Sequence, residues 1–224
     1  MAEISNLVTV GFILTTLTTL WFFYKASMSK IVLFGIIIWM IVVSLLGLSG
    51  FYRNTEVYPP RFIFLISPGI LFVLFIFFTS SGRKFSDSLN LKWLTLLHVV
   101  RIPVEIILFY VFLEGLLPDL MTFEGYNFDI LSGLSAPIIY YLVFVKKWVG
   151  FKGLLLWNSI CLGLLLNILI IAILSAQTPF QKLALNQPNI GVAYFPFVWL
   201  PTVIVPIVLF SHLVSIRAFY KSKF

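Results

Sequence analysis

Residues 31–41 read IVLFGIIIWMI and residues 70–78 read ILFVLFIFF, two runs without a charged side chain. A membrane β-barrel needs segments of about ten residues in which lipid-facing and lumen-facing side chains alternate. A continuous apolar run instead favours an α-helix, because a helix satisfies its own backbone hydrogen bonds within lipid. These two stretches therefore predict an all-α integral membrane protein.

The composition of the whole chain agrees with this prediction. Hydrophobic residues make up 61% of the 224 residues and charged residues only 10%, against about 25% charged in a soluble domain. Seven apolar runs predict a seven-transmembrane-helix bundle that forms a single polytopic domain over residues 1–224. The expected spans are about 4–24, 31–52, 62–82, 93–117, 130–145, 153–175 and 192–216.

The first and the fifth of these runs carry further expectations. Residues 1–3 contain Glu3 and no basic residue, so the first run does not have the basic region of a cleavable signal and is expected to stay in the mature protein. The fifth run has only 16 residues and is expected to recruit flanking residues in order to span.

Basic residues predict the orientation. Eleven of them flank one side of the expected bundle: Lys25, Lys30, Arg83, Lys84, Lys92, Lys146, Lys147, Lys152, Arg217, Lys221 and Lys223. The other side has three: Arg53, Arg61 and Lys182. The positive-inside rule then places the N-terminus outside and the C-terminus in the cytoplasm. The net charge of +7 follows from these flanking residues, so no nucleic-acid partner is expected.

The fourth run is the only one with charged residues inside it. His98, Arg101 and Glu105 fall within a stripe about 60° wide on one helix. An ionisable group at the centre of a membrane helix costs on the order of 3 kcal/mol, so the stripe is expected to face the bundle interior. The alternative is structural: Arg101 and Glu105 are four residues apart and could pair within the helix.

The second histidine lies in the seventh run. His212 precedes Arg217 by five residues and His98 follows Lys92 by six, so both imidazoles are expected at one depth near the cytoplasmic face. Such a pair could ligate a b-type haem, handle protons, or simply bond to backbone and lipid at the interface.

Two asparagines lie in the sixth run. Asn158 and Asn167 are nine residues apart and so lie on opposite faces of a helix, which allows at most one of them to join the stripe. Pro103 would free the carbonyl of Val99, and freed carbonyls are tolerated where they line a cavity. A shared polar cavity between spans four, six and seven is therefore expected.

Two outer connections are longer and richer in polar residues: 118–129, PDLMTFEGYNFD, and 177–191, QTPFQKLALNQPNIG. One interpretation makes them an interfacial belt with helix caps, Asn127 or Asp129 capping the fifth span. The other makes them the mouth of an outward-facing cavity. The candidate mouth residues are Glu124, Asn127, Asp129 and Asn189.

The stretches LHVVRIPVE (97–105), MTFEGYNFD (121–129) and QPN with PFVWLP (187–189 and 196–201) resemble a class of small uncharacterised bacterial seven-span proteins. The resemblance implies a bacterial inner (cytoplasmic) membrane and says nothing about activity.

The sequence leaves three functions open. The first is binding or transport of a small solute or protons, without a cofactor, at a site made of His98, Arg101, Glu105, Asn158, Asn167 and His212. The second is an electron carrier with haem b on His98 and His212. The third is an enzyme acting on lipid or isoprenoid head groups, with Asp129 as the better placed acid. Partners beyond the bilayer and the oligomeric state are not indicated.

Overall fold

The computed structural model describes residues 5–55 and 57–221, and these residues form an all-α protein. No strand occurs among them, only an isolated bridge between Ala176 and Asn189. The α-helices are α1 (Asn6–Ser27), α2 (Lys30–Leu48), α3 (Ile63–Phe78), α4 (Ser80–Ser88), α5 (Leu91–Leu97), α6 (Arg101–Leu113), α7 (Ile130–Tyr140), α8 (Phe151–Ser175) and α9 (Val205–Lys221). Shorter 3₁₀ turns are η1 (Phe51–Arg53), η2 (His98–Val100), η3 (Asp119–Met121) and η5 (Gly191–Ala193), and π-helical turns are η4 (Tyr141–Val145) and η6 (Leu200–Ile204).

Helix length supports fewer spans than the sequence predicts. Within the described residues, five helical stretches are long and apolar enough to cross a membrane: α1, α2, Leu91–Leu113, α8 and Leu200–Lys221. A sixth exists only if α3 and α4 count as one span, although their axes differ by 94°. The stretch Ile130–Val145 is a shorter apolar helix. Each of the seven predicted runs is thus largely helical, but five or six have the length and composition of a span.

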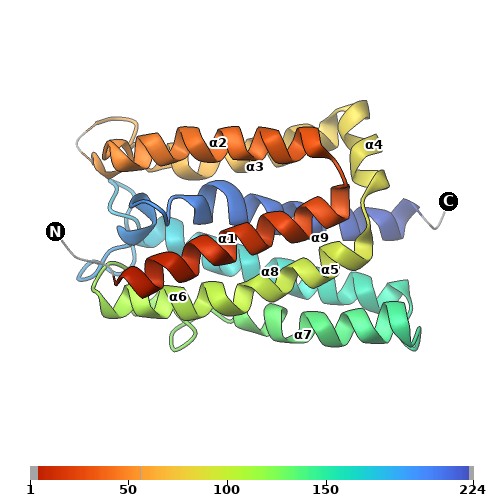
Figure 1. Cartoon of the computed structure of the whole chain (residues 1–224). Helices are drawn as coiled ribbons and strands as arrows, with labels where there is room; N and C mark the ends of the chain where they lie inside the picture. The colour runs from red at the N-terminus through yellow and green to blue at the C-terminus, as the bar shows by residue number, and fades with distance from the viewer. Residues whose placement is uncertain (1–4, 56, 222–224) are drawn as a thin grey trace.

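Most helices lie side by side, while α4 runs across the end of the bundle where α9 ends, and the two ends of the chain lie at opposite ends of the bundle (Figure 1). Leu200–Lys221 is the most buried of the long helices, with 67% of its apolar window inside, while α2 is only 17% buried. α2 is therefore a peripheral helix. By contrast, α1 packs along α5 and α6 and buries Thr15, Thr16 and Thr19.

Several spans begin or end at other residues than the sequence predicts. The third span, expected to reach residue 82, stops at Phe78, because the Thr79 hydroxyl accepts a hydrogen bond from the Gly82 N–H and starts α4. The seventh, expected from residue 192, is helical only from Leu200, and its first turn η6 is π-helical before α9 begins at Val205. The second ends at Leu48, the fourth at Leu113, and the predicted start of the first, residue 4, lies outside the described residues.

The charged stripe of His98, Arg101 and Glu105 lies where the fourth span changes from α-helix to a 3₁₀ turn and back to α-helix. Pro103 has no N–H to donate, so the backbone before α6 tightens into the 3₁₀ turn η2, which carries His98. Arg101 then starts α6, close to the middle of the composite helix Leu91–Leu113. The predicted irregularity at this proline therefore falls at the centre of the bundle.

Candidate functional site

Helix α7 begins deep in the bundle and not at its end. Gly115 ends the preceding helix with a positive φ of 76°, and the chain then returns inward until Asp129 precedes the first residue of α7. Gly133 allows α7 to approach α6, since a Cβ there would lie 2.8 Å from Cγ1 of Ile102 and 3.3 Å from Cβ of Arg101. In Figure 1, α7 runs along only one half of the length of the bundle, the half in which α9 ends.

This descent brings a carboxylate to the buried guanidinium. Nη1 of Arg101 lies 2.7 Å from Oδ1 of Asp129, and the two side chains are 3% and 7% exposed. Removing one member of such a pair leaves a buried charge without compensation, at a cost of about 3–5 kcal/mol. The partner of Arg101 is thus 28 residues away, and the alternative of a local pair with Glu105 is not what the structure shows.

The second contact of Arg101 determines the tautomer of His212. Nη2 of Arg101 lies 3.1 Å from Nε2 of His212, and a guanidinium only donates, so Nε2 is the accepting nitrogen. Nδ1 lies 2.9 Å from Oδ1 of Asn158, whose amide nitrogen donates to the Leu154 carbonyl, so Nδ1 carries the proton and donates. His212 is therefore neutral in this arrangement.

His98 stacks on His212 and has no polar partner among the described residues. The ring centroids are 4.0 Å apart with an interplanar angle of 18°, and both ring nitrogens of His98 lack a hydrogen bond. Trp157 packs edge-on against His98 and donates to the Ser135 hydroxyl. Axial haem ligands would need two nitrogens that point at one iron from opposite sides, and stacked rings with His212 engaged at both nitrogens do not provide them.

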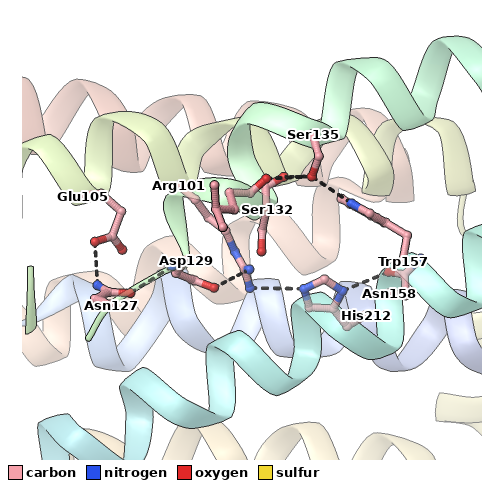
Figure 2. A network of polar contacts seen from close by, with 10 residues as sticks. Arg101, Glu105, Asn127, Asp129, Ser132, Ser135, Trp157, Asn158 and His212 are labelled. Atoms are coloured by element: carbon pink, nitrogen blue, oxygen red, sulfur yellow. Dashed lines mark hydrogen bonds and ion pairs between the residues drawn. The ribbon is translucent and has the colours of Figure 1, made fainter. Parts of the chain in front are cut away.

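A second carboxylate lies on the other side of the ion pair. The amide nitrogen of Asn127 donates to Oε2 of Glu105 and to the Met121 carbonyl, while its oxygen accepts from the Asp129 N–H. Figure 2 shows the resulting line of contacts from Glu105 through Asn127, Asp129, Arg101 and His212 to Asn158. Two buried carboxylates therefore share one buried cation within the described residues.

A cavity of about 70 Å³ lies beside the carboxylates. Its polar wall is formed by Arg101, Glu105, Asp129 and Asn189. The remaining walls are apolar and come from α3, α6, α8, η6 and α9. About 10–15 Å³ of such volume holds one water molecule, so the space is suited to protons, a few waters or the polar end of a larger molecule.

The candidate residues divide into two groups. His98, Arg101, Glu105, Asn158 and His212 meet in the bundle, so the inward orientation of the stripe and the common depth of the two histidines are confirmed. Of the two asparagines, only Asn158 joins; Asn167 is exposed and donates to the Tyr126 carbonyl.

The candidate mouth residues behave differently from the interpretation given to them. Asn127 and Asp129 do not lie at an outer mouth, since they are 0% and 5% exposed and contact Glu105 and Arg101. Asn189 is also buried, and only Glu124 is exposed. Asp129 precedes α7 but forms no side-chain cap, because its carboxylate is directed to Arg101.

Three members of the polar network in Figure 2, namely Ser132, Ser135 and Trp157, were not among the predicted residues. Ser135 and Trp157 join α7 to α8, and Trp157 lies directly before Asn158. Their sequence signal was weak, because a tryptophan and a serine in apolar helices are as common in plain packing as in a polar network.

The fold and the buried cluster together define an all-α protein with several helices of membrane-spanning length around an ionised core. Residues 61–220 match the family model described as a domain of unknown function (DUF8737), which is more than two thirds of the chain, and the protein therefore belongs to this family. No curated protein and no solved structure matches the chain.

Proposed function

We propose that this protein is a seven-span protein of the bacterial inner membrane that binds and transfers protons at Glu105. Five long helices, α3 and the short α7 supply the seven crossings, and the connection before α7 fills the outer half of the fifth. The distribution of basic residues supports an external N-terminus and a cytoplasmic C-terminus. Glu105 lies about 12 Å from the outer end of α6 at 1.5 Å per residue.

The observation that carries the proposal is the charge count around the cavity. Asp129 neutralises Arg101 through a direct ion pair, which leaves Glu105 without a cation of its own among the described residues. An uncompensated charge in a low-dielectric interior is strongly unfavourable. A proton on Glu105 makes the cluster neutral, so gaining or losing this proton changes the charge of the whole site.

Arg101 divides the site into two compartments. The cavity and Glu105 lie on one side of the guanidinium, and the stacked histidines lie on the other. A fixed positive charge excludes protons from a pathway, as it does in water channels. Passage toward His98 therefore requires the contacts of Arg101 with Asp129 and His212 to rearrange, as expected for a carrier and not for an open channel.

The proposal is tested by measuring whether the Glu105 carboxyl group is protonated. At neutral pH the exposed carboxyl groups are ionised. Infrared spectra of the reconstituted protein at this pH should therefore show a carboxylic acid band that is absent in Glu105→Gln. Asn127 can still donate to the glutamine oxygen, so folding is expected to survive. The matched control is Glu114→Gln, an exposed acid one residue past α6, which should keep the band.

Transport is measured in the same preparation. In proteoliposomes with an imposed potassium diffusion potential, internal pH should change faster than in empty vesicles, and Glu105→Gln should abolish the difference while Glu114→Gln keeps it. A carboxylic acid band that persists in Glu105→Gln would refute the proposal.

Neither alternative function gains support from a specific contact. The stacked histidines do not favour haem ligation. Asp129 is buried against Arg101, so it is not available at the outer edge as an acid for head-group chemistry.

A further inference from the structure

The cavity beside Glu105 is partly open. Five of the residues that line it are partly exposed and form its rim, and all five are apolar: Ile66 in α3, Ile168, Leu169 and Ala172 in α8, and Val205 in α9. An opening into water would be expected to carry polar side chains at its rim. Other apolar side chains of these two helices are exposed, such as Phe64 in α3 and Ile170 in α8. In the membrane arrangement proposed above, the cavity therefore opens toward the hydrocarbon of the bilayer.

The backbone behind the opening is irregular. The π-helical turn η6 contributes Leu200, Pro201 and Ile204 to the wall. Turns of this kind are rare and occur frequently at functional sites. The Trp39 indole of α2 donates to the Thr202 carbonyl within this turn, so the widened backbone is held in place by the peripheral helix.

One buried acceptor in the cavity wall, Oδ1 of Asn189, has no hydrogen-bond donor among the described residues. Asn189 is 1% exposed, its amide nitrogen donates to the Ala172 carbonyl, and its Oδ1 has no partner. A buried acceptor without a donor costs about 1–3 kcal/mol, so a ligand that donates would be favoured here. Nε of Arg101 is also unpaired, but the charge of Arg101 is already matched by Asp129.

We propose that this lateral cavity binds a lipid-soluble primary amine, which reaches it from the bilayer and takes the proton of Glu105. The amine arrives neutral, its nitrogen lone pair forms the new N–H bond, and the O–H bond of Glu105 breaks. The product is an ammonium–carboxylate pair with no change in total charge. The ammonium donates to the Glu105 carboxylate and to Oδ1 of Asn189, while the alkyl chain lies along the apolar walls.

This inference rests on the proposed proton-carrying role of Glu105. The volume of the cavity then narrows the class of ligand that it can bind. A volume of about 70 Å³ accommodates an amino group and the first methylenes but not a ring system. The remaining chain must lie between α3 and α8, toward the lipid. A linear alkylamine therefore fits, and dodecylamine is a suitable probe.

Binding is measured with protein in lipid nanodiscs by equilibrium partition of dodecylamine, with dodecanol and dodecyltrimethylammonium as the neutral and permanently charged comparisons. Dodecylamine should bind at least tenfold more tightly than either. Its addition at constant pH should remove the infrared carboxylic acid band of Glu105, which the quaternary ion should not do, because it accepts no proton.

Two variants separate this inference from the proposed function. Ala172→Phe fills the rim without touching a charged group, so it should weaken dodecylamine binding at least tenfold and keep the acid band of Glu105. Ile173→Phe, on the exposed side of the same helix, is the matched control and should bind normally. Equal binding of amine and alcohol, or an unaffected Ala172→Phe, would overturn the amine site. Absence of the acid band in the unmodified protein would instead refute the proton role.

Discussion

The two long connections, 118–129 before α7 and 177–191 after α8, have similar compositions but different roles. In the connection before α7, Asn127 and Asp129 turn inward and contact Glu105 and Arg101. In the connection after α8, Gln181 and Gln187 bond to backbone carbonyls of the loop itself and of the chain around Leu117. The first connection thus supplies the partners of Arg101 and Glu105, whereas the second closes the end of the bundle and reaches the cavity only through Asn189. The difference lies in what each polar side chain meets, which composition does not reveal.

The largest effect is expected when the first connection loses its charge. Asp129→Ala leaves Arg101 buried without its ion pair and should lower the free energy of unfolding by about 3–5 kcal/mol. Chemical unfolding in detergent micelles measures this loss. Glu124→Ala, an exposed acid in the same connection, should change stability by less than about 0.5 kcal/mol. Equal losses of stability in the two variants would contradict the structural role assigned to Asp129.

An intermediate loss of stability is expected when one side-chain amide is removed from either connection, and the two losses should differ. Asn127→Ala leaves the Met121 carbonyl and the Asp129 N–H without their partner inside the bundle, at a cost of about 1–3 kcal/mol. Gln187→Ala removes bonds to Phe112 and Leu117 carbonyls that are only partly buried, so about 0.5–1.5 kcal/mol is expected. The same unfolding experiment ranks them, and a larger loss for Gln187→Ala would reverse the comparison.

The smallest effect concerns a carboxylate at the opposite end of the bundle. Hydrogen bonds from Arg217 and Lys221 lower the pKa of Asp87 below its usual value of 3.8. The stabilisation is therefore present above that value and is lost as the pH falls through the lowered pKa. Because these side chains are partly exposed, Asp87→Asn should cost only about 0.2–1 kcal/mol near pH 7, and nothing in strongly acidic solution. A pH series of unfolding curves checks both the size and the sign, and a cost approaching that of Asp129→Ala would contradict the role assigned to burial.

Helical periodicity predicted the part of the site that lies within single helices. The spacing of His98, Arg101 and Glu105 placed them on one inward stripe, and loop charges placed His212 at the depth of His98. The nine-residue spacing of Asn158 and Asn167 likewise admitted only one of them. Such predictions succeed because the geometry of a helix is determined locally.

The partner of Arg101 could not be predicted in this way. A nearby Glu105 suggested a local pair, whereas Asp129 reaches Arg101 only because the chain folds back and Gly133 lets α7 approach α6 closely. The bend after Phe78 and the irregular start of the seventh span escaped for a related reason, since hydropathy reports which residues avoid water and not where the backbone turns.

The position of α7 has a consequence for the order in which the protein is assembled during synthesis. Ile130–Val145 is shorter than the stretch of about 20 residues that crosses a bilayer on its own. It packs against α8 through Ala136, Leu154 and Cys161 and through the Trp157–Ser135 bond, so we expect the insertion machinery to receive the two as a helical hairpin. Arg101 leaves the ribosome before its counter-ion does, and α6 is therefore expected to remain beside the insertion machinery until this hairpin delivers Asp129.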